Sequence, residues 1–146
     1  MNTTQTLQQM QQLRLHGMYH AYRSQLELPM DQQLEGHDLV AHLLQSEDLN
    51  RTNEKTAYYL KLAKLRLPAT IEQVECSPAR NITKQQLASM IEGRYLQQGE
   101  NILVTGATGC GKSYLACALG HQACLQGYKT CYLNMNRLIE KVTLSK

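Results

Sequence analysis

The chain has 146 residues, of which 42% are hydrophobic, and its formal net charge is +3. It contains no Phe or Trp, so a core must be built mainly from aliphatic side chains. No stretch approaches the ~18 consecutive apolar residues of a membrane span, and the polar N-terminus lacks the apolar segment of a signal peptide. The five cysteines include no C-x-x-C pair, which disfavours a zinc site or a disulfide framework. We therefore expect a cytoplasmic protein of one domain, or of one domain and part of another.

Residues 1–67 are predicted to form an all-helical region. Apolar residues recur at three-residue steps near the N-terminus, and Gly17 is expected to interrupt that helix. Pro29 should end a second short helix. The clearest helix is predicted over residues 47–67, because an apolar stripe continues along one face until Pro68.

Residues 68–100 are expected to link this region to a second one. A short β-like segment falls within residues 68–82. Thr83 and Gln86 have the spacing of a capping box, which predicts a helix that begins after Thr83. Gly93 is expected to end this helix.

Residues 101–146 are predicted to alternate between strands and helices. In chain order we expect a strand over Ile102–Thr105, a helix from about Gly111 that Gly127 caps, a strand over Tyr128–Leu133, and a final helix capped by Asn134 or Asn136. This order predicts the α/β class with a parallel sheet. Two parallel strands cannot bury both faces or satisfy their edges, so the predicted sheet is incomplete unless a partner completes it.

The most specific motif is a phosphate-binding loop at the start of this region. The pattern G-x-x-x-x-G-K-[ST] is matched by Gly106, Ala107, Thr108, Gly109, Cys110, Gly111, Lys112 and Ser113. Glycines let bare backbone N–H groups surround a phosphate, and the N-terminus of the following helix adds its dipole. Lys112 would reach the β- and γ-phosphates of ATP, and the Ser113 hydroxyl would bind Mg²⁺. An ammonium ~4 Å from a phosphate charge contributes about 4 kcal/mol at an effective dielectric of 20, so Lys112 should matter most.

A chance glycine turn is the alternative interpretation of this loop, and the flanking strand and helix make it the weaker one. Hydrolysis would also need an acidic residue at the end of another strand. The only carboxylate after Ser113 is Glu140, which is predicted to lie on a helix, and no Asp follows Asp48. We therefore expect this chain to bind ATP without hydrolysing it.

Charge is segregated in the helical region. Residues 24–50 hold six acidic residues and no Lys or Arg, whereas residues 51–67 hold only Glu54 against five basic residues. The basic residues are Arg51, Lys55, Lys61, Lys64 and Arg66. A basic face with interleaved apolar side chains suits the backbone of double-stranded DNA or an acidic partner. The alternative is a solvated helix face that pairs with the acidic segment, and the sequence leaves both open.

The motifs together resemble the IstB-type ATP-binding helpers of insertion-sequence transposition, relatives of the DnaC helicase loaders in the AAA+ superfamily. The likeness rests on LAKLRLPATIE, on GEN before the predicted strand, on the phosphate loop, and on LACALGHQA followed by GY and NRL. It implies a P-loop domain of the AAA+ type preceded by an all-helical DNA-binding region. The Walker A positions would be Gly106, Gly109, Gly111, Lys112 and Ser113. It also implies ATP-dependent self-oligomers that assemble on double-stranded DNA and assist a transposase.

The resemblance leaves other functions open. Family members continue through Walker B acids, a sensor residue and an arginine finger, none of which is found here, so we expect a truncated ATPase domain. One alternative is a DnaC-like helicase loader in replication, whose helical region would contact a hexameric helicase. Another is a non-enzymatic remnant that binds DNA.

Overall fold

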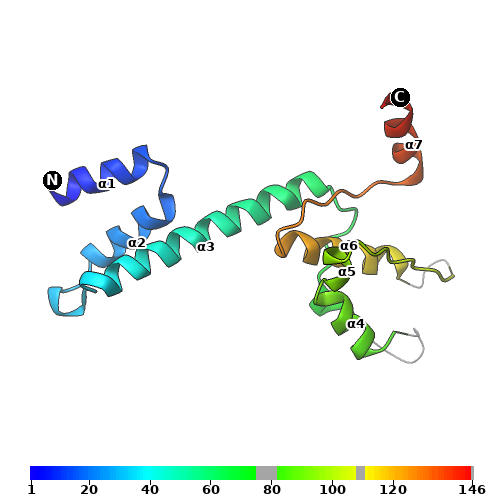
Figure 1. Cartoon of the computed structure of the whole chain (residues 1–146), viewed down its shortest axis with the longest axis horizontal. Coiled ribbons are helices and arrows are strands. Elements are labelled where there is room, and N and C mark those ends of the chain that lie inside the picture. Colours follow the sequence, from blue (N-terminus) through cyan, green and yellow to red (C-terminus); the bar gives the residue numbers. More distant parts are fainter. Residues whose placement is uncertain (75–81, 108–110, 146) are drawn as a thin grey trace. The chain divides into compact units, whose positions relative to one another are not determined.

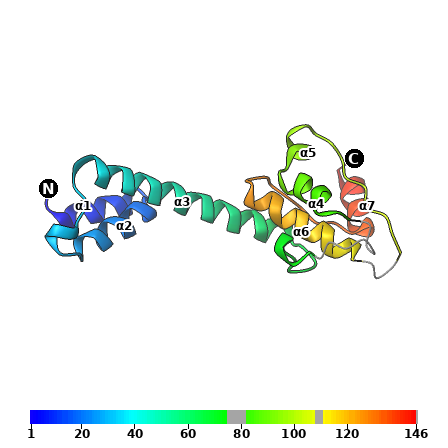
Figure 2. The same ribbon diagram turned by 90° about the horizontal axis from the view of Figure 1, so that it is seen from below.

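The computed structural model describes residues 1–74, 82–107 and 111–145. The chain divides into two compact units, residues 1–55 and 56–146. The α-helices are α1 (Thr3–Gln12), α2 (His16–Leu26), α3 (Gly36–Ala63), α4 (Lys84–Ile91), α5 (Arg94–Gln97), α6 (Lys112–Leu125) and α7 (Met135–Leu144). Two 3₁₀ turns accompany them, η1 (Met30–Gln32) and η2 (Ile71–Gln73). Figures 1 and 2 show α3 as one unbroken helix, so the helix predicted over 47–67 begins earlier and ends four residues sooner.

Among the described helices, none has both the length and the apolar character that crossing a membrane requires.

The first unit begins with two helices joined by a three-residue turn. Asn2 and Gln5 form a capping box that starts α1, because each side chain bonds the backbone N–H of the other residue. The helix ends at Gln12 with Leu13 as its C-cap, and Arg14 then adopts a left-handed φ of +59°. The N–H of Leu15 donates to the carbonyl oxygen of Met10 at 2.8 Å. The first helix therefore ends before Gly17, which lies instead in the first turn of α2.

Helix α2 packs between α1 and α3 (Figure 1), and Gly17 makes the closest approach to α3. A Cβ atom on Gly17 would lie 2.5 Å from the carbonyl oxygen of Ser46 and 2.8 Å from the Cα of Glu47. Only glycine allows the backbones of the two helices to come this close. Its role is thus helix packing rather than helix termination.

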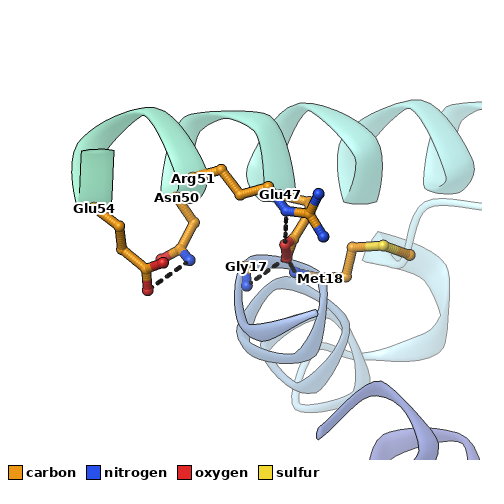
Figure 3. Close-up of polar contacts among 6 residues, drawn as sticks. All are labelled: Gly17, Met18, Glu47, Asn50, Arg51 and Glu54. Carbon is orange, nitrogen blue, oxygen red and sulfur yellow. Dashed lines mark hydrogen bonds and ion pairs between the residues drawn. The ribbon is translucent and has the colours of Figure 1, made fainter. Parts of the chain in front are cut away.

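The Glu47 carboxylate of α3 caps the N-terminus of α2 (Figure 3). One oxygen accepts hydrogen bonds from the backbone N–H groups of Gly17 at 2.9 Å and Met18 at 3.4 Å. The other lies 3.3 Å from Nε of Arg51. Glu47 is buried, and α2 has no side-chain cap of its own at Leu15. A negative charge at this position satisfies free N–H groups and interacts favourably with the helix dipole.

The second unit has one apolar core built around α6. Its buried members are Ala69, Ile71, Leu87, Leu115, Cys117, Ala118 and Leu119. The end of α3 joins the same unit, because Ala63 is fully buried and its carbonyl oxygen accepts a hydrogen bond from the N–H of Tyr132 at 2.8 Å. A fully buried Leu or Ile contributes about 1.5–3 kcal/mol, so these side chains hold α6, η2 and α4 together.

The local caps predicted in this unit are confirmed. The Thr83 hydroxyl accepts from the N–H of Gln86 at 3.1 Å, and the Gln86 side chain bonds the N–H of Thr83 in return. Gly127 is left-handed at φ +90° directly after α6. The Asn134 side chain accepts from the N–H of Arg137 at 2.8 Å, which makes Asn134 the cap of α7.

The predicted α/β class is wrong, because the described residues contain helices and no strand. A strand needs a neighbour with which to exchange backbone hydrogen bonds, and the two predicted strands do not pair with each other. Residues 101–107 make no backbone hydrogen bond within the part of the chain that the structure describes. In Tyr128–Leu133, the N–H of Tyr132 bonds the end of α3 instead of a strand. The apolar patterns are those of strands, but the residues that the structure describes form no ladder.

Candidate nucleotide site

The described part of the phosphate loop includes the N-terminus of α6, which begins at Lys112 directly after Gly111. Gly111 is left-handed, with φ +92°, and its carbonyl oxygen accepts the first helical hydrogen bond, from the N–H of Leu115 at 3.0 Å. No side chain caps this terminus. The first N–H groups of a helix have no partner within it, so this end of α6 offers donors and a positive dipole end to an anion. Thr108, Gly109 and Cys110 lie outside the described residues.

Lys112 reaches back across the loop. Its ammonium Nζ donates to the carbonyl oxygen of Gly106 at 2.6 Å, six residues earlier in the chain. The Lys112 side chain therefore bridges the start and the end of the predicted motif. Ala107 and Ser113 are exposed on either side of the segment that the structure leaves out. This arrangement concentrates one positive charge, one hydroxyl and a helix N-terminus in a small volume.

Helix α6 is anchored firmly behind the loop. Leu115, Leu119 and Cys124 are among its buried residues. The Tyr114 hydroxyl donates to Oε1 of Gln73 at 2.7 Å, which ties the first turn of α6 to η2. A rigidly packed helix holds its N-terminal N–H groups in a fixed direction, which suits preorganised binding of an anion.

The segment that leads into the loop is extended and mostly exposed. Val104 packs against the core of the second unit. Leu103 points away from it and is 88% exposed, and Ile102 is 38% exposed. Of these three side chains only Val104 contacts the core, and it is half-buried, as is expected where one face of an extended segment lies on a core. Val104 is therefore the residue that holds the entry to the loop in place.

The five basic residues predicted to bind DNA are all exposed. Arg51 lies in the first unit, where its guanidinium pairs with Glu47. Both members of that pair lie on α3, four residues apart, so the pair does not decide between DNA binding and the alternative of a helix face that pairs with the acidic segment. In the second unit, Lys61, Lys64 and Arg66 form neither an ion pair nor a side-chain hydrogen bond within the residues described. These three charges are available to a partner.

Comparison with known families decides where the chain belongs. The model of the family described as IstB-like ATP binding protein matches residues 8–146. The match includes most of the first unit, the whole second unit and therefore the whole phosphate loop. The chain belongs to the family of IstB-like ATP-binding proteins. The resemblance inferred from the sequence motifs is thereby confirmed.

Curated relatives of this IstB-like chain are named for insertion sequences. A protein of Pseudomonas fluorescens, named as an ATP-binding protein of insertion sequence IS1162, is 38% identical over 146 residues. A second, from Sinorhizobium fredii and named as insertion sequence ATP-binding protein y4uH, is 35% identical over 137 residues. These alignments cover 99% and 94% of this chain but 63% and 55% of the relatives. The chain therefore spans less than two thirds of the length of either relative.

Two features of this IstB-like chain were not predicted. The bond between Tyr114 and Gln73 joins residues 41 positions apart, and no local pattern could have indicated it. The cap that Glu47 places on α2 spans 30 positions. A glycine next to a helix start is a weak signal for close packing, and Gly17 was instead interpreted as a helix breaker.

Proposed function

We propose that this IstB-like protein binds the phosphates of ATP through the loop from Gly106 to Ser113. The observation that carries the proposal is the Lys112 ammonium, held against Gly106 at the uncapped N-terminus of α6. Family membership supports the same ligand. A triphosphate would compete with the Gly106 carbonyl for Lys112, because a charged acceptor forms the stronger hydrogen bond.

Mg²⁺ would accompany the nucleotide. The exposed Ser113 hydroxyl is an oxygen donor of the kind that Mg²⁺ accepts, and Mg²⁺ usually keeps most of its waters and is held by phosphate oxygens. The chain therefore needs to supply only one ligand. Ser113 fits that role, and the remaining charge compensation at the phosphates falls to Lys112.

Competition between nucleotides tests this proposal. A fluorescent ATP analogue bound to the full chain should be displaced by ATP and by inorganic triphosphate, and not by adenosine. This order follows because Lys112 and the α6 terminus recognise charge rather than the base. Displacement by adenosine as effective as displacement by ATP would contradict a phosphate site.

We also infer that the protein binds double-stranded DNA and assists a transposase. Support comes from Lys61, Lys64 and Arg66, which are exposed and form no ion pair with the residues that the structure describes, and from relatives named for insertion sequences. Each phosphate neutralised releases counterions, so log K should fall with log salt by roughly 0.9 per contact. Replacing all three residues by Ala should weaken DNA binding and reduce that slope by about 2.7. The matched control is Lys129→Ala, an exposed lysine of the same unit.

A binding experiment distinguishes a transposase from a replicative helicase as the partner protein. A transposase of an insertion sequence should be retained on the immobilised chain, whereas a replicative helicase should not. Retention of the helicase alone would favour the loader function instead. DNA binding without either protein would favour a non-enzymatic DNA-binding role.

A further inference from the structure

The outer face of α1 carries neutral amides rather than charges. At ~100° per residue, Gln8, Gln9 and Gln12 fall within an arc of about 100° on this helix. Leu7 and Met10 lie on the opposite side and are half-buried. The three glutamines are exposed, and none of their side-chain amides has a hydrogen-bond partner within the residues described. Each therefore presents a free donor and a free acceptor to the solvent.

Helix α1 is the accessible member of a helix–turn–helix pair. It contacts α2 after the turn at 13–15, and none of its own residues is fully buried. In DNA-binding motifs of this kind the second helix usually enters the groove with its N-terminal residues. Here the N-terminus of α2 faces the Glu47 carboxylate and packs on α3, so it cannot do so (Figure 3). The outer face of α1 remains open.

Charge favours a polyanion on this side of the first unit. Residues 1–26 contain two basic residues, Arg14 and Arg23, and no acidic residue. Arg23 lies 3.9 Å from Glu27, so of these two only Arg14 has no ion pair among the described residues. All six acidic residues of residues 1–50 follow from Glu27 onward. Glu47 is an acidic side chain that the structure places at the N-terminus of α2, where it pairs with Arg51. Helix α1 itself presents no acidic residue to a nucleic acid, unlike the turn between α2 and α3.

We propose that α1 lies in the major groove of DNA and reads adenine through the amides of Gln8, Gln9 and Gln12. The proposal rests on the DNA binding proposed above and adds base recognition to it. A glutamine amide matches adenine because it accepts from N6 and donates to N7, and no other base offers that pair in the major groove. The alternative is that the glutamines only keep an exposed helix face solvated.

Fluorescence anisotropy on the full chain tests the proposal with two duplexes of equal length, one rich in A·T and one rich in G·C. The native chain should prefer the first by about tenfold or more. A third duplex with 7-deazaadenine lacks the N7 acceptor but keeps Watson–Crick pairing, and it should lose most of that preference. This duplex separates major-groove reading from a preference for a narrow minor groove.

The variant Gln8→Ala/Gln9→Ala/Gln12→Ala should bind the G·C duplex within about twofold of the native chain and lose the preference for A·T. Alanine is the better helix former, so α1 should persist, which far-UV circular dichroism checks. The matched control is Gln97→Ala/Gln98→Ala, two exposed glutamines in the other unit. Equal binding to both duplexes by the native chain, or an unchanged preference in the triple variant, overturns the inference alone. Absence of binding to any duplex overturns it together with the proposed DNA binding.

Discussion

Glu47 of α3 and Gly17 of α2 are joined by a hydrogen bond of 2.9 Å from a backbone N–H to a buried carboxylate oxygen. The contact does two things at once, because the glycine lets the helices approach and the carboxylate caps the helix that approaches. Both residues belong to the first unit. Their effect should therefore be confined to the stability of the first unit.

Replacing Glu47 by Ala should destabilise the first unit by about 1–3 kcal/mol. The change leaves the N–H of Gly17 without its acceptor in a buried position, and that desolvation cost is of this size. Urea unfolding followed by far-UV circular dichroism measures it. Asp48→Ala is the control, since Asp48 is exposed on the same helix and should change stability by less than about 0.5 kcal/mol. Equal effects of the two substitutions would refute the capping role.

Replacing Gly17 by Ala should also destabilise the first unit, by about 2 kcal/mol or more, although alanine favours helix by about 1 kcal/mol. The added Cβ would sit 2.5 Å from the Ser46 carbonyl oxygen, so the helices must separate. Ser24→Ala, at an exposed position of α2, should be neutral or slightly stabilising. Thermal unfolding compares the three proteins. A stabilised Gly17→Ala protein would show that the helices do not pack this closely.

Gly93 offers a test of the second unit. It adopts φ +74°, and a Cβ there would collide with Oε1 of Gln126, whose Nε2 donates to the carbonyl oxygen of Ile91 at 2.6 Å. Gly93→Ala should cost about 1–2 kcal/mol for the left-handed backbone and more for the displaced amide. Adding Gln126→Ala removes the collision, so the two substitutions should cost less together than the sum of each alone. Strict additivity in chemical unfolding would contradict this contact.

Local signals predicted the fold where both partners lie within a few residues. The Thr83–Gln86 capping box, the Asn134 cap and the left-handed Gly127 are all interactions of this range. The two predicted strands were wrong, because a strand depends on a hydrogen-bonded neighbour that the local pattern does not specify. In the extended segment around Val104, that side chain packs on the core, but the described residues form no hydrogen-bonded ladder there.

In the candidate site too, the local contact could be predicted from the sequence and the long-range contact could not. Lys112 and Gly106 lie six residues apart within one motif, and the motif was enough to predict that both belong to one loop. The support of that loop by Gln73 was not predictable, because it depends on how η2 folds onto α6. The basic residues were predicted by composition, which indicates a surface charge but not which charges already have partners, as Arg51 does.

The 146-residue chain should bind ATP without turning it over. The only carboxylate after Ser113 is Glu140, which is exposed on α7, and a P-loop ATPase needs an acidic group beside its Mg²⁺ and attacking water. Phosphate release should stay at background and be the same in native and Lys112→Ala proteins. Release in the native chain that Lys112→Ala abolishes would contradict this prediction.

The most direct test of the nucleotide site is isothermal titration of Mg²⁺·ATP into the native chain, Lys112→Ala and Lys129→Ala. An ammonium beside a phosphate charge contributes about 4 kcal/mol, so Lys112→Ala should weaken binding by up to about three orders of magnitude. Lys129→Ala, which removes an exposed lysine outside the loop, should bind as the native chain does. An unchanged affinity in folded Lys112→Ala would contradict the assignment of this loop to ATP.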